Sequence, residues 1–408
     1  MDFKNNRFTI ITTAIISVLV ISFFSFFFLH EIKGSAPNHS VNAAKTVPET
    51  EKRVSFVGVG DNLIHDSIYN AADRRKGAFG DGDYDFTSLY SNIKSDIKKY
   101  DIRYINEESI IAGDKYGIHT YPKFNAPQAM IPALEDAGFN LINLANNHSM
   151  DMGSQAIIDS VNLWDKENVY HTGLYKSQEE RDKPLIIDKN GIKIAVLSYT
   201  YDTNGMTPDK EYMVPYLNEE KIREDIARAK KESDFILVSA HWGDEHIHNI
   251  NQTEEKYSKL FNDLGVDAVL GTHAHVIQKA GWMKNDKGEK TLIYFGTGNF
   301  VHNMLGADPY LEGMASWDFV KKGNKKYIEN AKFTPLVFHL ENNQYGLDGS
   351  VYRLDRYPVE LANRHYAMGG AGQYNIEKYK EMVKSLIPSD MIDMNFDNQV
   401  KDSNTASK

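Results

Sequence analysis

Five short polar motifs in the sequence carry the residue types that bind divalent metal ions. Each follows a short apolar run, and together they are Gly60-Asp61-Asn62-Leu63-Ile64-His65, Asn106-Glu107-Glu108, Asn146-Asn147-His148, His241-Trp242-Gly243-Asp244-Glu245 and Gly271-Thr272-His273-Ala274-His275. Imidazole and carboxylate groups suit divalent ions such as those of manganese, iron and zinc. The residue types therefore predict a metal site that is built from segments lying far apart in the sequence.

The number of candidate ligands is enough for two ions. Two divalent ions about 3.5–4 Å apart can share a hydroxide nucleophile and stabilise the negative charge that develops on a phosphoryl group. A carboxylate that bridges the ions offsets their repulsion, and Glu108 is placed for that role. His273 and His275 lie two residues apart after a strand, so their side chains can face different ions. We therefore expect two divalent ions of manganese, iron or zinc.

Each motif taken alone has a simpler explanation. A single Asp or His after a strand usually caps a helix or lies in a solvated loop. Asn147-His148-Ser149 also matches a glycosylation sequon. Five such motifs in one chain are harder to attribute to chance, and they favour the metal site.

The apolar runs predict short β-strands, and several of the segments between them predict helices. The expected strands cover residues 54–60, 102–105, 140–144, 194–199, 235–240, 268–271 and 292–295, with a closing pair at 333–340 and 346–354. Tyr257, Leu260, Phe261 and Leu264 follow the spacing of one helical face. Strands that alternate with helices indicate an α/β fold. Because ligands bind at the carboxyl ends of strands in such sheets, we expect the five motifs to meet in one pocket.

The composition excludes several classes of site. The 408 residues carry a formal net charge of −10, which does not favour nucleic acid as a partner, because its phosphates need clustered Lys and Arg. There are no cysteines, so disulfides, thiolate nucleophiles and Cys-ligated zinc are excluded.

The N-terminus contains a segment that is long and apolar enough to span a membrane. Residues 8–29 carry no charge, and at about 1.5 Å per residue they can cross a hydrocarbon core of about 30 Å. Lys4 and Arg7 precede the segment, which predicts a cytoplasmic N-terminus at residues 1–7 and an extracytoplasmic domain. The expected location is therefore the cell membrane, with a single-pass signal anchor at residues 8–29. A cleaved signal peptide is the alternative.

The sequence beyond this segment divides into four parts. Residues 30–52 are polar and predict a linker. Residues 53–355 contain the strands and the motifs and predict the α/β domain. Residues 356–387 predict a C-terminal surface extension, and the polar, acidic residues 388–408 predict a disordered tail.

The order of the motifs resembles the CapA family of capsule and poly-γ-glutamate biosynthesis proteins. The resemblance covers roughly residues 54–303 and includes Leu144 to His148 and Gly298-Asn299-Phe300. That family includes the membrane component of poly-γ-glutamate synthesis and export complexes, and it is related to calcineurin-like metallophosphoesterases. The resemblance implies an α/β fold that is a four-layer α-β-β-α sandwich of two sheets flanked by helices, preceded here by one transmembrane helix.

The resemblance also implies roles for individual residues. The implied ligands are Asp61 and His275 for the first metal, Asn147, His241 and His273 for the second, and Glu108 as the bridge between them. His148, which is next to a ligand, is implied as the general acid that protonates the leaving oxygen. We expect Asn106, Glu245 and Asn299 at the rim of the pocket.

The sequence departs from the phosphoesterase pattern at the first strand. Active phosphoesterases have Asp-x-His there, whereas the histidine that follows Asp61 in this sequence is His65, four residues on. His65 is a candidate metal ligand that could reach the metal from the first turn of a helix, or could miss it. Glu108 also departs from the pattern, because its side chain is one methylene longer than the usual bridging Asp.

Two classes of function follow from the resemblance. One is a metal-dependent hydrolase that cleaves the amide bonds of a polyanionic polymer such as poly-γ-glutamate, or a phosphoester of that pathway or of another cell-envelope substrate. The other is a non-catalytic scaffold of a polymer synthase and export complex. A full ligand set favours the hydrolase, and the family context favours the scaffold. In both cases the expected partners are the membrane proteins of polymer synthesis and export.

Overall fold

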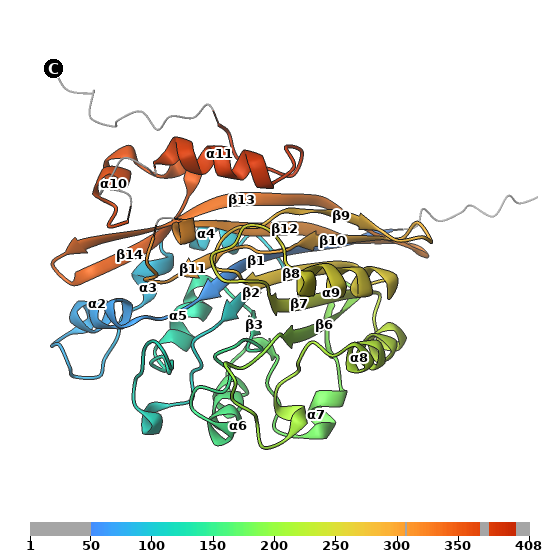
Figure 1. Cartoon of the computed structure of the whole chain (residues 1–408), viewed down its shortest axis with the longest axis horizontal. Coiled ribbons are helices and arrows are strands. Elements are labelled where there is room, and N and C mark those ends of the chain that lie inside the picture. The colour runs from blue at the N-terminus through green and yellow to red at the C-terminus, as the bar shows by residue number, and fades with distance from the viewer. Residues whose placement is uncertain (1–49, 307, 368–374, 397–408) are drawn as a thin grey trace, which may run out of the picture. The chain divides into compact units, whose positions relative to one another are not determined.

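Two β-sheets pack face to face in the computed structural model, which describes residues 50–306, 308–367 and 375–396 (Figure 1). The strands of the first sheet are β1 (Glu51–Asn62), β2 (Ile102–Glu107), β3 (Leu141–Asn143), β4 (Tyr170–Thr172), β11 (Asn299–Val301), β12 (Leu311–Lys322), β13 (Lys325–Asn343) and β14 (Gly346–Arg353). They lie in the order β14-β13-β12-β1-β2-β3-β4, with β11 paired to β1. The strands β1 to β4 pair in parallel, whereas β12, β13 and β14 are antiparallel to their neighbours.

The second sheet has six strands. They are β5 (Leu185–Lys189), β6 (Ile192–Thr200), β7 (Phe235–Trp242), β8 (Ala268–His273), β9 (Ala280–Lys284) and β10 (Lys290–Tyr294). Their order is β5-β6-β7-β8-β10-β9. The central strands β6, β7, β8 and β10 are parallel, and the two edge strands are antiparallel to them.

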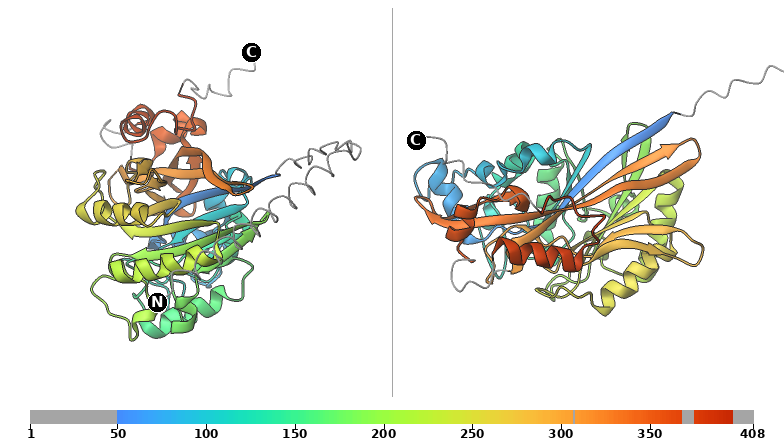
Figure 2. Two further views of the ribbon diagram at one scale, coloured as in Figure 1. Left: turned by 90° about the vertical axis from the view of Figure 1, so that its right-hand side faces the viewer. Right: turned by 90° about the horizontal axis from the view of Figure 1, so that it is seen from above.

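Helices connect the strands and cover the sheets. The α-helices are α2 (Asp66–Lys76), α3 (Thr87–Tyr90), α4 (Lys94–Ile97), α5 (Met130–Ala137), α6 (Ser154–Trp164), α7 (Gln178–Asp182), α8 (Glu219–Glu232), α9 (Gln252–Asp263), α10 (Val359–Arg364) and α11 (Ile376–Leu386). Short 3₁₀ turns span Asp114–Tyr116, Glu211–Met213, Asp308–Tyr310 and Leu354–Arg356. Figures 1 and 2 show α8 and α9 beside the second sheet and α11, in red, lying along the first.

Both faces of the second sheet are buried. In β7, Phe235 and Leu237 belong to the core between the two sheets, whereas Ile236 and Val238 pack in a second core with residues of α8 and α9. This alternation follows from the period of two residues along a strand. Each fully buried large apolar side chain contributes about 1.5–3 kcal/mol to the stability of the folded state. The two layers of contacts therefore fix how the helices and sheets stack.

The parallel strands of the two sheets end at the same end of the sandwich. The backbone N–H of His273, at the end of β8, donates to Oδ2 of Asp61 in β1 at 3.1 Å. Near the opposite end, Lys326 of β13 pairs with Asp267, just before β8, at 3.0 Å. Contacts at both ends therefore hold the sheets in one relative position.

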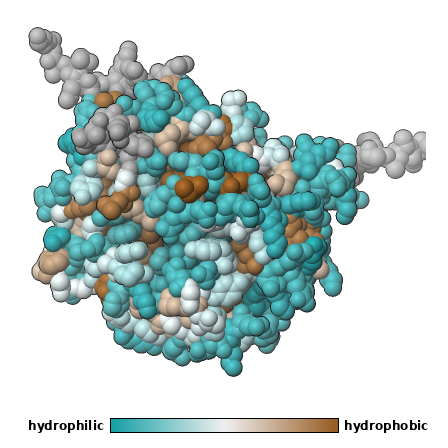
Figure 3. Space-filling view, in the orientation of Figure 1, coloured by the Kyte–Doolittle hydropathy of each residue, from teal (hydrophilic) through white to brown (hydrophobic). Residues whose placement is uncertain are grey.

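The C-terminal segment packs on the first sheet. The N–H of Phe333 donates to the carbonyl of Met391 at 2.7 Å, and the N–H of Asp393 donates to the carbonyl of Phe333 at 2.9 Å. The boundaries predicted for the parts of the chain stay predictions, and the tail beyond residue 396 lies outside the described residues. The face of the molecule seen in Figure 3 is mainly hydrophilic, with apolar residues in small groups.

The fold prediction is wrong in including a transmembrane helix. No helix within residues 50–306, 308–367 and 375–396 is long and apolar enough to cross a bilayer. The predicted span at residues 8–29, the N-terminus at 1–7 and most of the linker at 30–52 lie outside the described residues. The predicted single-pass, extracytoplasmic location depended on that span and is corrected with it. The predicted α/β architecture of two sheets agrees with the structure.

We expect Gly60→Ala to destabilise the protein, because β1 and the chain before β11 come too close for a side chain. An added Cβ would lie 1.8 Å from the carbonyl oxygen of Gly298. The backbone has to shift, at a cost of about 1–3 kcal/mol. The free energy of unfolding, measured in urea, would show the loss.

Gly58→Ala on the same strand is the matched control. Its added Cβ would meet the terminal Cδ2 of Leu270 at 2.5 Å, and a side-chain end moves more easily than a backbone. We expect a smaller loss of unfolding free energy. An equal loss in the two variants would mean that the close approach at Gly60 is not a constraint.

Candidate metal centre

Side chains from all five sequence motifs meet at the carboxyl ends of the parallel strands. Potential ligand atoms lie within 4.8 Å of one another in three overlapping groups, which are Glu108–His241–His273, Asp61–Glu108–His275 and Glu245–His273–His275. Asn147 joins them through its Oδ1, which is 2.8 Å from Nε2 of His241. Apart from the exposed Glu245, these side chains are at most 2% exposed, so the ligands are buried rather than spread along an open pocket.

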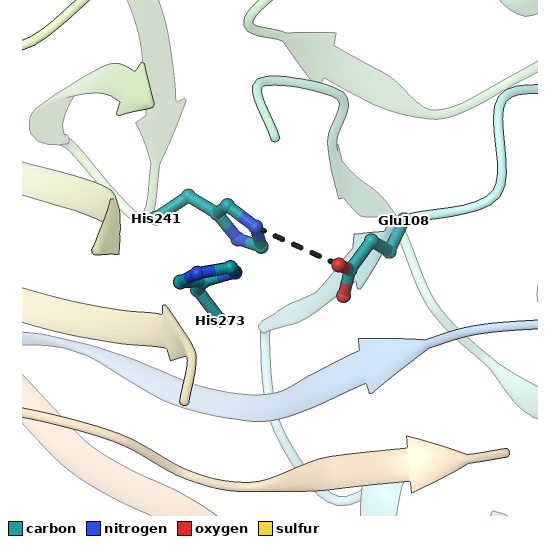
Figure 4. A group of neighbouring side chains, drawn as sticks. All are labelled: Glu108, His241 and His273. Atoms are coloured by element: carbon teal, nitrogen blue, oxygen red, sulfur yellow. Dashed lines mark ion pairs between the residues drawn. The ribbon is translucent and has the colours of Figure 1, made fainter. Parts of the chain in front are cut away.

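Glu108 belongs to two of the three groups, and neither of its carboxylate oxygens has a hydrogen-bond partner. Figure 4 shows its carboxylate facing the ring of His241 beside His273. Its Oε1 is 3.6 Å from Nε2 of His241 and 3.7 Å from Nε2 of His275. Burial raises the pKa of Glu108 well above its usual range, and the nearby Asp61 adds to the shift. Within the described part of the chain, no Lys or Arg pairs with Glu108. A divalent cation would supply the missing counter-charge.

Asp61 is held in place by donors on both sides. The side-chain amide of Asn106 donates to its Oδ1 at 2.7 Å, and Nδ1 of His275 lies 3.2 Å from its Oδ2. Asn106 is itself fixed by a 2.7 Å hydrogen bond from the amide of Asn143. Asn106 is fully buried, so it lies beneath the ligands and not at the rim. Its role here is to orient Asp61.

The histidines of the second sheet are in the form that binds metals. Burial, and then the neighbouring histidines, lower the pKa of His241 and of His273 well below the usual range. Both are therefore neutral, and a neutral imidazole nitrogen is the ligand form. Nδ1 of His241 contacts Oγ1 of Thr272 at 2.9 Å, whereas Nδ1 of His273 has no partner.

His275 differs from the other two histidines because it touches a carboxylate. Burial alone would lower the pKa of His275, but the contact with Asp61 outweighs it and raises the pKa. Its Nδ1 lies 2.9 Å from Oδ1 of Asn299, whose amide donates to the carbonyl of His275 at 3.1 Å. Asn299 is fully buried and fixes the ring of His275.

His148 and Asp151 form a pair next to the candidate ligands. Nδ1 of His148 is 2.7 Å from Oδ2 of Asp151, which also accepts the N–H of Phe124 at 2.6 Å. This contact leaves Nε2 of His148 for another partner. The sequence analysis missed Asp151, and the only signal for it is an Asp three residues after His148, one turn of chain away.

The structure does not bring His65 into any of the three ligand groups. Its Nδ1 accepts the backbone N–H of Asn303 at 3.1 Å, and its ring packs edge-on against Phe124 with 5.4 Å between centroids. Phe124 also contacts His148, at 4.7 Å between centroids. Burial lowers the pKa of His65 to about 4, so the ring is neutral at physiological pH.

Two residues at the open side of the cluster complete the site. The ring of Tyr201, just after β6, lies 4.4 Å from the ring of His273 and is 38% exposed. The amide of Asn147 donates to Oδ1 of Asn204 at 3.3 Å. The sequence analysis did not find Tyr201 or Asn204, because neither an aromatic residue nor an amide in a loop signals metal chemistry.

Comparison with known proteins matches the sequence to bacterial capsule synthesis proteins. Residues 55–304 match the family described as bacterial capsule synthesis protein PGA_cap. The PGA biosynthesis protein CapA of Bacillus subtilis (strain 168) is 27% identical over 221 residues, which are 51% of this chain and 53% of that protein. The capsule biosynthesis protein CapA of Bacillus anthracis is 24% identical over 204 residues, 48% of each. The chain thus spans about half the length of the curated relatives it matches.

One solved structure also resembles the chain. It is a novel phosphatase from Mycoplasma pneumoniae, with a TM-score of 0.44 and 15% identity, and the match covers 71% of this chain and 95% of that one. A similarity at this level carries no argument about activity.

We expect Asp151→Asn to change the tautomer of His148 while the protein stays folded. In the native protein the carboxylate accepts the Nδ1 proton, which leaves Nε2 without one. An amide nitrogen at the place of Oδ2 would donate to Nδ1 and favour the proton on Nε2, and it would give up the hydrogen bond from the N–H of Phe124. Long-range proton–nitrogen NMR correlations of histidine-labelled, chelator-treated protein distinguish the two forms.

Asn204→Gly provides the control for this experiment. It leaves Asp151 in place and removes the weaker contact to Nδ1 of His148, at 3.5 Å, together with the hydrogen bond from the amide of Asn147, and glycine accepts the positive φ of 52° at this position. The tautomer should not change. A native protein with the proton on Nε2 would contradict the assigned pairing.

Proposed function

Because this chain belongs to the family of bacterial capsule synthesis proteins, we propose that it is a metal-dependent hydrolase in the synthesis of a capsular polymer. The bond it cleaves is a phosphoester or an amide of that polymer. The observation that carries the proposal is Glu108, whose two buried oxygens have no hydrogen-bond partner and face His241 and His275. A protein that used this fold only as a frame would gain nothing from such a carboxylate.

The donor set fits two divalent ions. The first would be held by Asp61, Glu108 and His275, and the second by Glu108, Asn147, His241 and His273. Carboxylate, amide and imidazole donors together suit manganese, iron or zinc. Bound ions would supply Lewis acidity toward a phosphoryl or carbonyl oxygen.

The chain's own residues supply the remaining chemistry. When its ring carries protons on both nitrogens, His148 donates the Nε2 proton to the leaving atom of the substrate as a general acid and keeps the Nδ1 proton that Asp151 accepts. Asp151, which contacts Nδ1 of His148, keeps the ring in one orientation throughout. Tyr201, partly exposed beside His273, forms a wall of the site on its open side.

The names of the relatives suggest the setting. The relatives are proteins of PGA and capsule biosynthesis, so we infer a polyanionic polymer such as poly-γ-glutamate, or a phosphoester formed during its synthesis, as substrate. A polymer synthase or exporter is the corresponding protein partner. A scaffold without catalysis would share these partners, and the following variants separate the two functions.

We expect His241→Asn to impair metal binding and His148→Ala to impair turnover. The Asn side chain keeps a polar atom near Thr272 but removes the distal nitrogen, so the metal content of the purified protein should fall. His148→Ala should keep the metal content and lower turnover by about 10²–10⁴-fold, the range for a lost general acid. Metal content by mass spectrometry and polymer yield in cells are the two measurements.

His171→Asn is the control, since this histidine pairs with Asp165 at 3.0 Å and belongs to none of the ligand groups. It should alter neither metal content nor yield. Thermal unfolding shows whether each variant is folded, because His241 is fully buried. Normal polymer yield from both site variants would rule out catalysis and leave the scaffold.

A further inference from the structure

We propose that Glu245 is a metal ligand on the solvent side of the site, where it completes the donor set around His273 and His275 in place of His65. The inference rests on the proposed metal-dependent function. Glu245 bonds directly to a divalent cation, and the ion exchanges with solvent when this bond breaks.

The geometry of the cluster supports this assignment. A carboxylate oxygen of Glu245 and a ring nitrogen of each of His273 and His275 lie within 4.8 Å of one another. Because His275 belongs to the donor set of the first ion and His273 to that of the second, a carboxylate at this spacing adds a donor beside both ions, and carboxylate joined to imidazole suits zinc and similar ions. The group shares His275 with Asp61 and Glu108, so Glu245 lies beside the donors of the first ion.

The loop that carries Glu245 is held against the histidines. Its next residue, His246, donates its backbone N–H to the carbonyl of Ala274 at 2.8 Å, and Ala274 lies between the two histidines. Gly243 and His246 both have positive φ angles, 99° and 62°, which turn the chain back toward the end of β8. The position of Glu245 therefore follows from the backbone and not from a freely moving tip.

An unpartnered buried nitrogen is a second, independent observation. Nδ1 of His273 has no hydrogen-bond partner, although the residue is only 2% exposed. A buried polar atom without a partner costs free energy, and coordination would remove that cost. This free nitrogen belongs to one of the two histidines that are grouped with Glu245.

The charges around Glu245 support the same assignment. Glu245 shares His275 with Asp61 and Glu108, and it shares His273 with Glu108, so three carboxylates gather around the same two histidines and repel one another. Glu245 pairs with no Lys or Arg in the residues that the structure describes. Surface acids commonly have basic partners in this protein, as Glu219 has Arg223 at 2.7 Å. A cation between the carboxylates resolves the repulsion.

His65 offers no alternative ligand in this arrangement. Its Nδ1 is occupied by the N–H of Asn303, and it belongs to none of the three ligand groups. The ring packs against Phe124. Glu245 is thus the ligand that the chain provides in place of His65.

The test is the metal affinity of the full-length, metal-free protein. Mn²⁺ and Zn²⁺ are titrated in a calorimeter, and the release of bound ion to a chelator is timed. Glu245→Gln should weaken the binding of one ion at least tenfold and speed its release, because a neutral amide replaces a charged ligand. Glu245 is exposed, so the variant should unfold at the native temperature.

Two matched variants complete the test. Asp244→Asn changes the neighbouring exposed acid, and His65→Asn keeps an acceptor for the N–H of Asn303 while it removes the distal nitrogen. Both should bind ions with native affinity. Native affinity in Glu245→Gln would overturn the inference, and a tenfold loss in His65→Asn would reassign the ligand to His65. No binding by the native protein would overturn the proposed function as well.

Discussion

Two carboxylates, those of Asp61 and Glu108, have to be held out of water where the ends of the two sheets meet. Burying an ion costs several kcal/mol unless hydrogen bonds or an opposite charge offset it. Asp61 meets this requirement with the amide of Asn106 and the backbone N–H of His273. Glu108 meets it only in part, because imidazoles flank it and no donor reaches its oxygens. The surrounding residues are arranged so that a bound cation can offset the remaining charge of Glu108.

The two sheets contribute different halves of this arrangement. The first supplies the carboxylates, and the second supplies His241, His273 and His275. Ligand spacing therefore depends on how one sheet is placed on the other, and close-packed interiors leave little freedom for that placement. The hydroxyls of Tyr104 in β2 and Ser239 in β7 lie 2.6 Å apart across the interface, so a buried polar contact also fixes how the sheets are placed.

Much of the fold was predictable from local sequence patterns. The strands expected at residues 54–60, 235–240 and 268–271 appear as parts of β1, β7 and β8, because buried parallel strands read as continuous apolar runs. β12 was missed, since Glu312 and Asp318 interrupt its apolar pattern although both lie within a paired strand. The meeting of the five motifs in one site was also predictable, because each motif follows the end of an expected strand.

Finer features of the site depend on tertiary contacts and could not be read from the sequence. Asn106 and Asn299 were expected at the rim and lie buried beneath the ligands, because their amides bond to Asp61 and His275. Asp151 and Tyr201 gain their places only through packing against His148 and His273.

The order of synthesis separates the ligands in time. On the ribosome, Asp61 precedes His275 by about 10–40 s at roughly 5–20 residues per second. β1 gains its antiparallel neighbour later still, because Val57 pairs with Ser316. Capture of the proposed metals would thus come late in biogenesis, after the ligands from all five motifs have emerged.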